Sequence, residues 1–215
     1  MTARTRIKIC GVSRPEDVAA AVDAGADAIG LVFHPGSPRH VSLERAALLA
    51  RGLPPYVSPV GLFVNAEAQA IAAAAAAIPH LVLQFHGDES AAACTSFGRP
   101  FLKAARMAPG FDLLDFASRF SEAQGLLLDA HVEAYGGSGK VFDWSLVPRG
   151  VPHRLVLSGG LHAGNVGSGI LEVRPWAVDV SSGVESARGV KDAAAIRAFC
   201  DAVREADSRI DASTS

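Results

Sequence analysis

Three polar side chains stand at or near the ends of apolar, strand-like runs, where folding could bring them together. Cys10 closes the first such run and is followed at once by Gly11, Asp129 follows three leucines, and Asp179 lies in a short apolar run near residue 180. A thiol becomes a base once it loses its proton, and a carboxyl group can give or take one. If the three strands are parallel and share a sheet, the sulfur and the carboxylates converge on one face. The pattern then predicts a site of acid–base chemistry.

Each of these residues also has a purely structural interpretation. A lone cysteine often packs as a small buried hydrophobic group. A carboxylate at a strand end can form a salt bridge or cap the next loop, because burying it without a partner is costly. Asp129 and His131 could together bind a metal, but no third ligand stands in evident register. Cys94 and Cys200 lie inside helix-like stretches, where we expect only packing roles.

Two loops rich in glycine and serine follow the last two strand-like runs. They are Ser158-Gly159-Gly160-Leu161 and Ser181-Ser182-Gly183-Val184. In barrels that take phosphate esters, the loops after strands seven and eight commonly hold the phosphate. Glycine lets the backbone approach closely, and exposed N–H groups hold the anion. Either loop alone could be a plain turn. Together they predict a phosphate site at Gly159, Gly160, Ser181, Ser182 and Gly183.

Eight apolar runs recur along the chain. Most are continuous rather than alternating, which is typical of strands buried on both faces of a parallel sheet. The predicted strands are Ile7–Cys10, Ala28–Phe33, Val57–Phe63, Leu81–Phe85, Phe101–Ala104, Leu126–Asp129, Leu155–Leu157 and Ala177–Val180. The predicted helices between or after them are Arg14–Ala24, Leu43–Gly52, Ala66–Ile78, Glu89–Phe97, Phe111–Phe120 and Lys191–Ala206, with short ones possible after Asp143 and His162.

Strands that alternate with helices fit an open doubly wound sheet or a closed (β/α)8 TIM barrel. The count of eight favours the barrel, and the dinucleotide fingerprint of a Rossmann sheet is missing after Cys10. We therefore expect one α/β domain, a TIM barrel of parallel strands over residues 1–206. Residues 207–215 have no periodic apolar pattern, and we expect them to be a disordered tail.

The overall composition limits the classes of function. The chain has 215 residues and a formal net charge of −2, so we expect neither nucleic acid nor a membrane as a partner. No apolar stretch approaches a membrane span, and the start runs straight into the first strand, which leaves no room for a signal peptide. Three widely spaced cysteines favour the cytoplasm over a disulfide framework. The CxxC and HExxH spacings of zinc sites are absent, so no metal is expected.

Seven blocks of sequence, in order and over about residues 6–200, resemble the phosphoribosylanthranilate isomerase family of tryptophan biosynthesis. Any one block would be weak evidence, but the ordered set is highly specific. The blocks are Lys8-Ile9-Cys10-Gly11-Val12-Ser13; Gly30-Leu31-Val32-Phe33-His34-Pro35 with Ser37-Pro38-Arg39; Gly61-Leu62-Phe63-Val64-Asn65; Leu83-Gln84-Phe85-His86-Gly87; Leu128-Asp129 with the glycine-rich stretch 136–144; Ser158-Gly159-Gly160-Leu161 with Asn165-Val166; and Asp179-Val180-Ser181-Ser182-Gly183-Val184-Glu185.

The resemblance implies a cofactor-free barrel enzyme for a small phosphorylated substrate. Its reaction would be the Amadori rearrangement of N-(5-phosphoribosyl)anthranilate to 1-(2-carboxyphenylamino)-1-deoxyribulose 5-phosphate. By resemblance, Asp129 is the general acid that protonates the furanose ring oxygen, and Cys10 is the general base that takes the proton from C2. Cys10 must act as a thiolate, by a lowered pKa or a proton relay. Asp129 must carry a proton near neutrality, so it should be desolvated or share one.

The resemblance also implies roles in substrate binding. Arg39 would hold the anthranilate carboxylate, which suits a planar guanidinium, although on its own it reads equally well as a surface arginine. The sugar would be lined by Gln84, His86 and Asp179. His34 and His162 fall in loops at the same end of the predicted barrel, and nothing local decides their roles.

Two rival interpretations stay open from the sequence. Another barrel enzyme for a ribose or glycerol phosphate would share the phosphate loops. Such an enzyme would need an aspartate at the end of the first strand, or a lysine and glutamate pair, where this chain has Cys10. A non-catalytic barrel could keep the phosphate site as a binding or scaffolding module, and retention of both Cys10 and Asp129 argues against it. The pattern leaves both a monomer and a homodimer possible.

Overall fold

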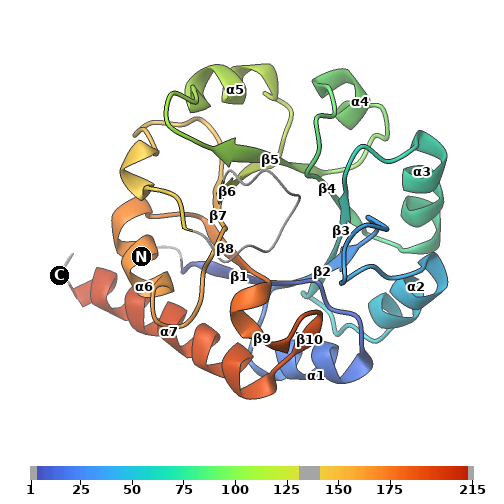
Figure 1. Ribbon diagram of the computed structural model, residues 1–215, viewed down its shortest axis with the longest axis horizontal. Coiled ribbons are helices and arrows are strands. Elements are labelled where there is room, and N and C mark those ends of the chain that lie inside the picture. Colours follow the sequence, from blue (N-terminus) through green and yellow to red (C-terminus); the bar gives the residue numbers. More distant parts are fainter. Residues whose placement is uncertain (1–3, 131–140, 213–215) are drawn as a thin grey trace.

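The computed structural model describes residues 4–130 and 141–212, and within them eight strands close into a barrel (Figure 1). Each strand pairs in parallel with the next, and β8 pairs with β1 to close the ring. This confirms the predicted TIM barrel. The strands are β1 (Arg6–Cys10), β2 (Ala28–Val32), β3 (Ser58–Phe63), β4 (Val82–Phe85), β5 (Phe101–Met107), β6 (Gly125–Ala130), β7 (Leu155–Leu157) and β8 (Ala177–Val180).

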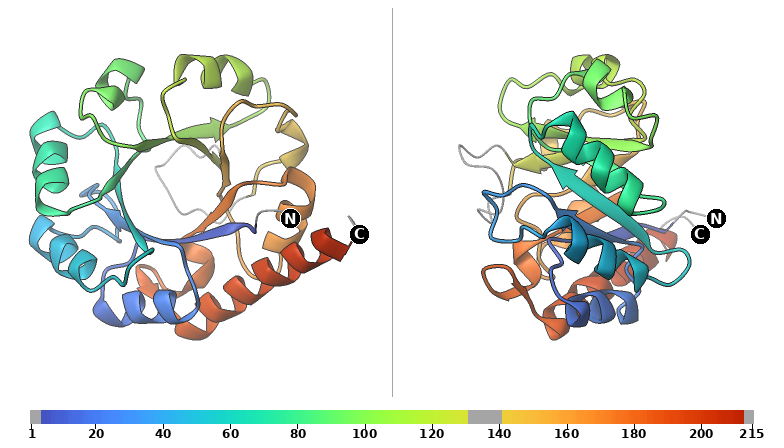
Figure 2. Two further views of the ribbon diagram at one scale, coloured as in Figure 1. Left: turned by 180° about the vertical axis from the view of Figure 1, so that it is seen from behind. Right: turned by 90° about the vertical axis from the view of Figure 1, so that its right-hand side faces the viewer.

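Helices surround the barrel on its outside, as both faces of the molecule show (Figure 2). They are α1 (Pro15–Asp23), α2 (Leu43–Arg51), α3 (Ala68–Ala77), α4 (Ala91–Thr95), α5 (Leu113–Arg119), α6 (Val166–Val173) and α7 (Ala193–Ala212), with 3-10 turns η1 (Trp144–Leu146) and η2 (Ser182–Val184). The side chains of Ser42, Ser90 and Asp112 cap α2, α4 and α5 by accepting hydrogen bonds from backbone N–H groups of the first turn. No helix in the described part of the chain is long and apolar enough to cross a membrane.

The last helix corrects the prediction for the end of the chain. A tail was expected from residue 207, but α7 continues to Ala212. Asp207 is anchored to the other end of the protein, because Thr5 donates to its carboxylate from the backbone N–H at 2.8 Å and from Oγ1 at 2.7 Å. Ile210 packs against the core from the same helix. These contacts keep both ends of the described chain on one side of the barrel (Figure 2).

Three smaller departures affect the mouth of the barrel. β5 runs three residues beyond its predicted end, to Met107, so Arg106 belongs to the strand. After β8 the chain forms η2 and then a two-stranded antiparallel sheet of β9 (Glu185–Ala187) and β10 (Val190–Lys191), which the sequence did not predict. As a result, the final helix begins at Ala193 rather than at Lys191.

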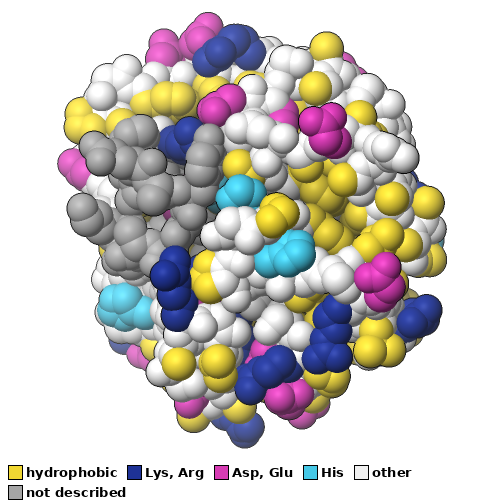
Figure 3. Space-filling view, turned by 45° about the vertical axis from the view of Figure 1, so that its right-hand side comes forward, with side chains coloured by type: hydrophobic (Ala, Val, Ile, Leu, Met, Phe, Trp, Pro, Cys, Tyr) yellow, Lys and Arg dark blue, Asp and Glu magenta, His cyan; other side chains and the backbone are white. Residues whose placement is uncertain are grey.

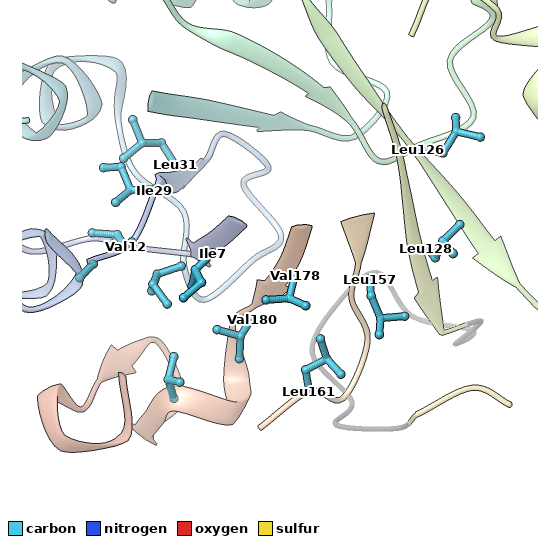
Figure 4. Packing of buried hydrophobic residues seen from close by; sticks show 14 of the residues in the cluster. Ile7, Val12, Ile29, Leu31, Leu126, Leu128, Leu157, Leu161, Val178 and Val180 are labelled. Carbon is cyan, nitrogen blue, oxygen red and sulfur yellow. The ribbon is translucent and has the colours of Figure 1, made fainter. Parts of the chain in front are cut away.

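The strands place two kinds of side chain on their two faces. The outer faces carry aliphatic side chains that pack under the helices, among them Ile7, Leu128, Leu157 and Val178 (Figure 4). The inner face holds a small separate cluster of Ala104, Leu127, Val156 and Ala177. Paired residues in a parallel sheet lie on the same face. The register therefore continues this inner face into polar residues at the carboxyl ends of the strands.

Candidate active site

The pairing register places the predicted polar residues on the inner face of the barrel. Lys8 pairs with Asp179, Cys10 with Gly30, and Arg106 with Asp129. The structure groups them into three clusters, on β1 and β8, on β4 and β6, and on the loops after β2 and β8. Histidine and hydrophobic side chains gather near the middle of the face in Figure 3, and charged side chains lie mainly around them.

The first cluster surrounds Cys10, which is 4% exposed. Burial raises the pKa of its thiol, and the ammonium of Lys8 opposes that rise by its charge and by a hydrogen bond to the sulfur. Lys8 is itself buried and forms an ion pair with Asp179, with 2.8 Å between Nζ and Oδ1. Burial disfavours the Lys8 charge, but Asp179 and Cys10 outweigh it and raise the lysine pKa. The resting sulfur is therefore held as a thiol next to a fixed cation.

Asp179 has a second partner in this cluster. Ser158, which follows β7, donates from Oγ to Asp179 Oδ2 at 3.4 Å. Opposite Cys10, Gly30 leaves room for the sulfur, because a Cβ at residue 30 would stand 2.6 Å from Sγ. The thiol position thus depends on two neighbouring strands, β2 and β8, as well as on its own.

The second cluster joins β4 to β6 across the barrel mouth. His86 lies between two partners: its Nδ1 is 3.1 Å from Nε2 of Gln84, and its Nε2 is 3.0 Å from Oδ2 of Asp129. The other Asp129 oxygen, Oδ1, accepts a hydrogen bond from the N–H of Ala130 at 2.9 Å. Arg106 donates to the His86 carbonyl oxygen at 3.3 Å and so fixes the same segment from β5. The predicted acid is therefore held by the imidazole ring of His86 and by the N–H group of Ala130.

The third cluster holds Arg39, in the loop after β2, in a two-pronged ion pair. Its Nε is 2.7 Å from Oε1 of Glu185 and its Nη2 is 2.8 Å from Oε2. Lys191 pairs with the same carboxylate at 2.8 Å. Burial would raise the pKa of Glu185, but hydrogen bonds from Arg39 and Lys191 hold it below its ordinary value. The Arg39 side chain is only 9% exposed, so it is a buried cation held in a fixed orientation and not a surface residue.

The two predicted phosphate loops lie against each other. Gly159 and Gly160 have φ angles of +80° and +65°, which favour glycine. A Cβ at Gly183 would collide with the carbonyl oxygen of Leu161, so the loop after β8 rests directly on the loop after β7. Lys191 donates to the Ser181 carbonyl oxygen at 3.0 Å, which places a cation beside these loops. The loops are thus brought together as predicted, although phosphate binding itself stays a prediction.

Some predicted features fall elsewhere. His131 and the glycine-rich residues 136–140 lie outside the described residues. His162 accepts a hydrogen bond at Nδ1 from the N–H of Gly164 at 3.1 Å, which is a local loop contact. Among the residues that the structure describes, no three His, Cys, Asp or Glu side chains form a group that could hold a metal ion.

Comparisons with known proteins bear on what this site does. The model of the N-(5'-phosphoribosyl)anthranilate (PRA) isomerase family matches residues 7–202. The chain belongs to this family. A relative of the same name from Methylibium petroleiphilum is 70% identical over 210 residues, which are 98% of this chain and 99% of the relative.

Solved structures of the PRA isomerase family agree. The enzyme from Thermotoga maritima matches with a TM-score of 0.87 and 42% identity, over 94% of this chain and 99% of that one. A second structure, in complex with reduced 1-(o-carboxyphenylamino)-1-deoxyribulose 5-phosphate, matches with a TM-score of 0.81 and 39% identity, over the same shares. A third, of monomers generated from the dimeric Thermotoga maritima enzyme, has a TM-score of 0.82, 38% identity and again the same shares.

Sequence reasoning missed three charged residues of this PRA isomerase site. Lys8 was part of a predicted strand and of a recognised block but received no role, although a lysine two residues before Cys10 on the same strand face was a signal. Glu185 was part of a recognised block but received no role. Lys191 was placed at a helix start, and no local pattern marked it as a partner of Glu185.

Proposed function

We propose that this chain isomerises N-(5'-phosphoribosyl)anthranilate to 1-(2-carboxyphenylamino)-1-deoxyribulose 5-phosphate, with Asp129 as general acid and Cys10 as general base. The observation that carries the proposal is the placement of a buried thiol beside Lys8 and a carboxylate beside His86 on the inner face of a barrel of this family. A purely structural Cys10 would not need a buried ion pair next to it.

The reaction begins at the ring oxygen of the sugar. Asp129 gives a proton to that oxygen, the bond from C1 to the ring oxygen breaks, and the anthranilate nitrogen and C1 form a Schiff base. Cys10, as a thiolate, then removes the proton from C2 and leaves an enolamine. A proton added at C1 and one lost from the C2 hydroxyl give the ketone. Acid and base catalysis of this kind typically contribute about 10²- to 10⁴-fold each.

Cys10 has to become a thiolate at the moment of reaction. In the structure its burial raises the pKa, and the neighbouring Lys8 and Lys191 are the groups that lower it. Lys8 also forms an ion pair with Asp179. If that ion pair weakens, the ammonium of Lys8 is freer to stabilise the thiolate and so to lower the pKa of Cys10. We therefore infer that the thiolate forms when substrate binds rather than before.

Binding would use the remaining clusters. The phosphate would rest on the backbone of Gly159, Gly160, Ser182 and Gly183, with the Ser181 hydroxyl beside it. The Arg39 guanidinium, fixed by Glu185, would face the anthranilate carboxylate through its remaining edge. The sugar would lie against Gln84, His86 and Asp179, which line the inner face between the acid and the base.

We further propose that the protein works in the cytoplasm, as a monomer or a homodimer. Cys10, Cys94 and Cys200 are all buried free thiols, which fits a reducing compartment. The enzyme from Thermotoga maritima is described as dimeric. Light scattering of the purified full chain over a range of concentrations distinguishes the two states.

The test of the function is direct. Purified protein is mixed with freshly prepared phosphoribosylanthranilate, and the loss of substrate fluorescence is followed while the product is identified by its ketone, since substrate and product are isomers of equal mass. We expect turnover by the intact chain and a loss of at least about 10²-fold in Asp129→Asn. Binding of inorganic phosphate without turnover would instead support a non-catalytic barrel. Full activity of Asp129→Asn would refute the assignment of Asp129 as the general acid.

A further inference from the structure

Gln84 is an unusual residue to find sealed inside this barrel. Its side chain is 0% exposed on β4, and Nε2 lies 3.1 Å from Nδ1 of His86. Its carbonyl oxygen, Oε1, is buried and has no hydrogen-bond partner among the residues that the structure describes. A buried acceptor left unpaired is destabilising and rare in proteins, so it calls for an explanation.

The hydrogen-bond chain from Gln84 has a fixed direction. A carboxamide nitrogen can only donate, so Nδ1 of His86 must be the unprotonated nitrogen. A neutral imidazole carries its one proton on the other nitrogen, Nε2, which then donates to Oδ2 of Asp129 at 3.0 Å. The Ala130 N–H donates to Oδ1. Both oxygens of Asp129 therefore accept, which is the arrangement of a charged carboxylate.

A general acid needs one proton more than this arrangement holds. One place for that proton is Nδ1 of His86, where the Gln84 N–H group now stands. A half turn of the carboxamide exchanges its nitrogen and oxygen and brings Oε1 to face Nδ1. The new N–H at Nδ1 then donates to Oε1, which gains a partner, while the amide nitrogen moves to the place that Oε1 has left. The second proton lies between Nε2 and Oδ2, where Asp129 can take it.

We propose that Gln84 is the positioning residue of the general acid: the orientation of its carboxamide selects the His86 tautomer and thereby the proton content of the His86–Asp129 pair. The proposal rests on Asp129 being the acid. With the amide nitrogen toward His86 the pair holds one proton, and with the oxygen toward His86 it holds two. The extra proton comes from water, passes from Asp129 to the ring oxygen, and stays there as the hydroxyl group of the product, after which the carboxamide turns back.

Charged groups on the neighbouring strands are engaged with partners of their own. From β5, Arg106 donates to the His86 carbonyl oxygen and pairs with Asp88 at 3.4 Å. The β7 end presents Ser158 and Gly159, and neither ionises. Toward the carboxyl ends of β1 and β8, the described inner face carries Lys8, Cys10 and Asp179, which are engaged with one another. Gln84 is thus the group in contact with Nδ1, the nitrogen that changes state.

The test reads the tautomer directly, by 15N NMR of protein labelled in its histidine rings. In the intact protein near neutral pH we expect His86 to be protonated at Nε2 and not at Nδ1. Gln84→Glu offers only acceptor oxygens, so it should move the proton to Nδ1. Gln84→Met offers neither donor nor acceptor, so it should give a mixture of tautomers. Gln124→Met, the same change at an exposed glutamine outside the site, should leave His86 as it is.

Kinetics give the second readout. Gln84→Met should lower kcat about tenfold, the size expected for one hydrogen bond, with KM changed less than about twofold, and it should change the pH dependence of kcat. A resting His86 protonated at Nδ1 in the intact protein overturns the proposal, and this needs no variant to fold. An unchanged tautomer and unchanged kcat in Gln84→Met overturn it as well. Full activity of Asp129→Asn with the expected tautomers would refute the acid assignment and not the control of His86 by Gln84.

Discussion

Replacement of Lys8 by methionine would remove the ammonium that stands 2.8 Å from the Asp179 carboxylate while keeping most of the volume of the side chain. The two side chains are only 5% and 6% exposed, so solvent cannot take over the role of the lost partner. Asp179 would be left with the Ser158 hydroxyl at 3.4 Å. An uncompensated buried charge of this kind typically costs about 3–5 kcal/mol of unfolding free energy.

The pair should therefore behave non-additively. We expect Lys8→Met and Asp179→Asn each to be strongly destabilised, and the double variant to be clearly more stable than the sum of the two losses, because no unpaired charge remains in it. For a chain of 215 residues, 3–5 kcal/mol corresponds to a fall in Tm of about 6–20 °C. Denaturant unfolding of the four proteins gives the cycle. Arg209→Met, at an exposed ion pair with Glu205, is the matched control and should change stability by less than about 1 kcal/mol.

The same substitution has a predicted effect on chemistry. Lys8 lowers the pKa of the Cys10 thiol, so its loss should raise that pKa, and the alkaline rise of kcat/KM should move to higher pH. The double variant separates the two effects, because it restores stability without restoring the cation. Two results would refute the description of the Lys8 cluster. One is additive losses of stability, and the other is an alkaline rise of kcat/KM that occurs at the same pH in Lys8→Met as in the intact protein.

Three further predictions concern the binding groups. Arg39→Met should raise KM by tenfold or more, since the carboxylate loses its charged partner, with a smaller effect on kcat; an unchanged KM would contradict the role. Gly183→Ala should force the loops after β7 and β8 apart, because its Cβ has no room beside Leu161, and the inhibition constant for inorganic phosphate should rise about tenfold or more; equal inhibition of both proteins would place the phosphate elsewhere. Hydrogen bonds from Arg39 and Lys191 hold the pKa of Glu185 below its ordinary value of 4.5, so its contribution to stability is present at neutral pH and lost as the pH falls through the lowered value. The difference in unfolding free energy between the intact protein and Glu185→Gln should therefore shrink as the pH falls below 4.5, and a constant difference would count against the ion pair.

The strands and the ends of the strands were predictable because their signals are local. A strand buried on both faces reads as a continuous apolar run, and Cys10 and Asp129 interrupt such runs at their carboxyl ends. Parallel pairing then brings those ends to one edge whatever the details of the helices. The predicted site residues Gln84 and His86 became neighbours of Asp129 for the same reason.

The partners of these residues were not predictable, because each contact depends on the closed ring. Lys8 meets Asp179 only because β8 pairs with β1, across 171 positions of sequence. Glu185 and Lys191 approach each other through the short β9–β10 sheet, which has too few residues to show a pattern. The end of α7 was missed because its own sequence looks polar, while Asp207 is held by Thr5 at the opposite end of the chain and Ile210 packs against the core.

The thiol of Cys10 is proposed to take the proton from C2 of the substrate, and kcat/KM of Cys10→Ala on freshly prepared phosphoribosylanthranilate tests that role. Cys94→Ala is the matched control, since that thiol is also buried, lies in α4, and has a pKa that burial raises to about 11. We predict a fall of at least about 10²-fold for Cys10→Ala and full activity for Cys94→Ala, with both proteins folded by circular dichroism. Equal activity of Cys10→Ala and the intact protein would show that Cys10 is not the general base.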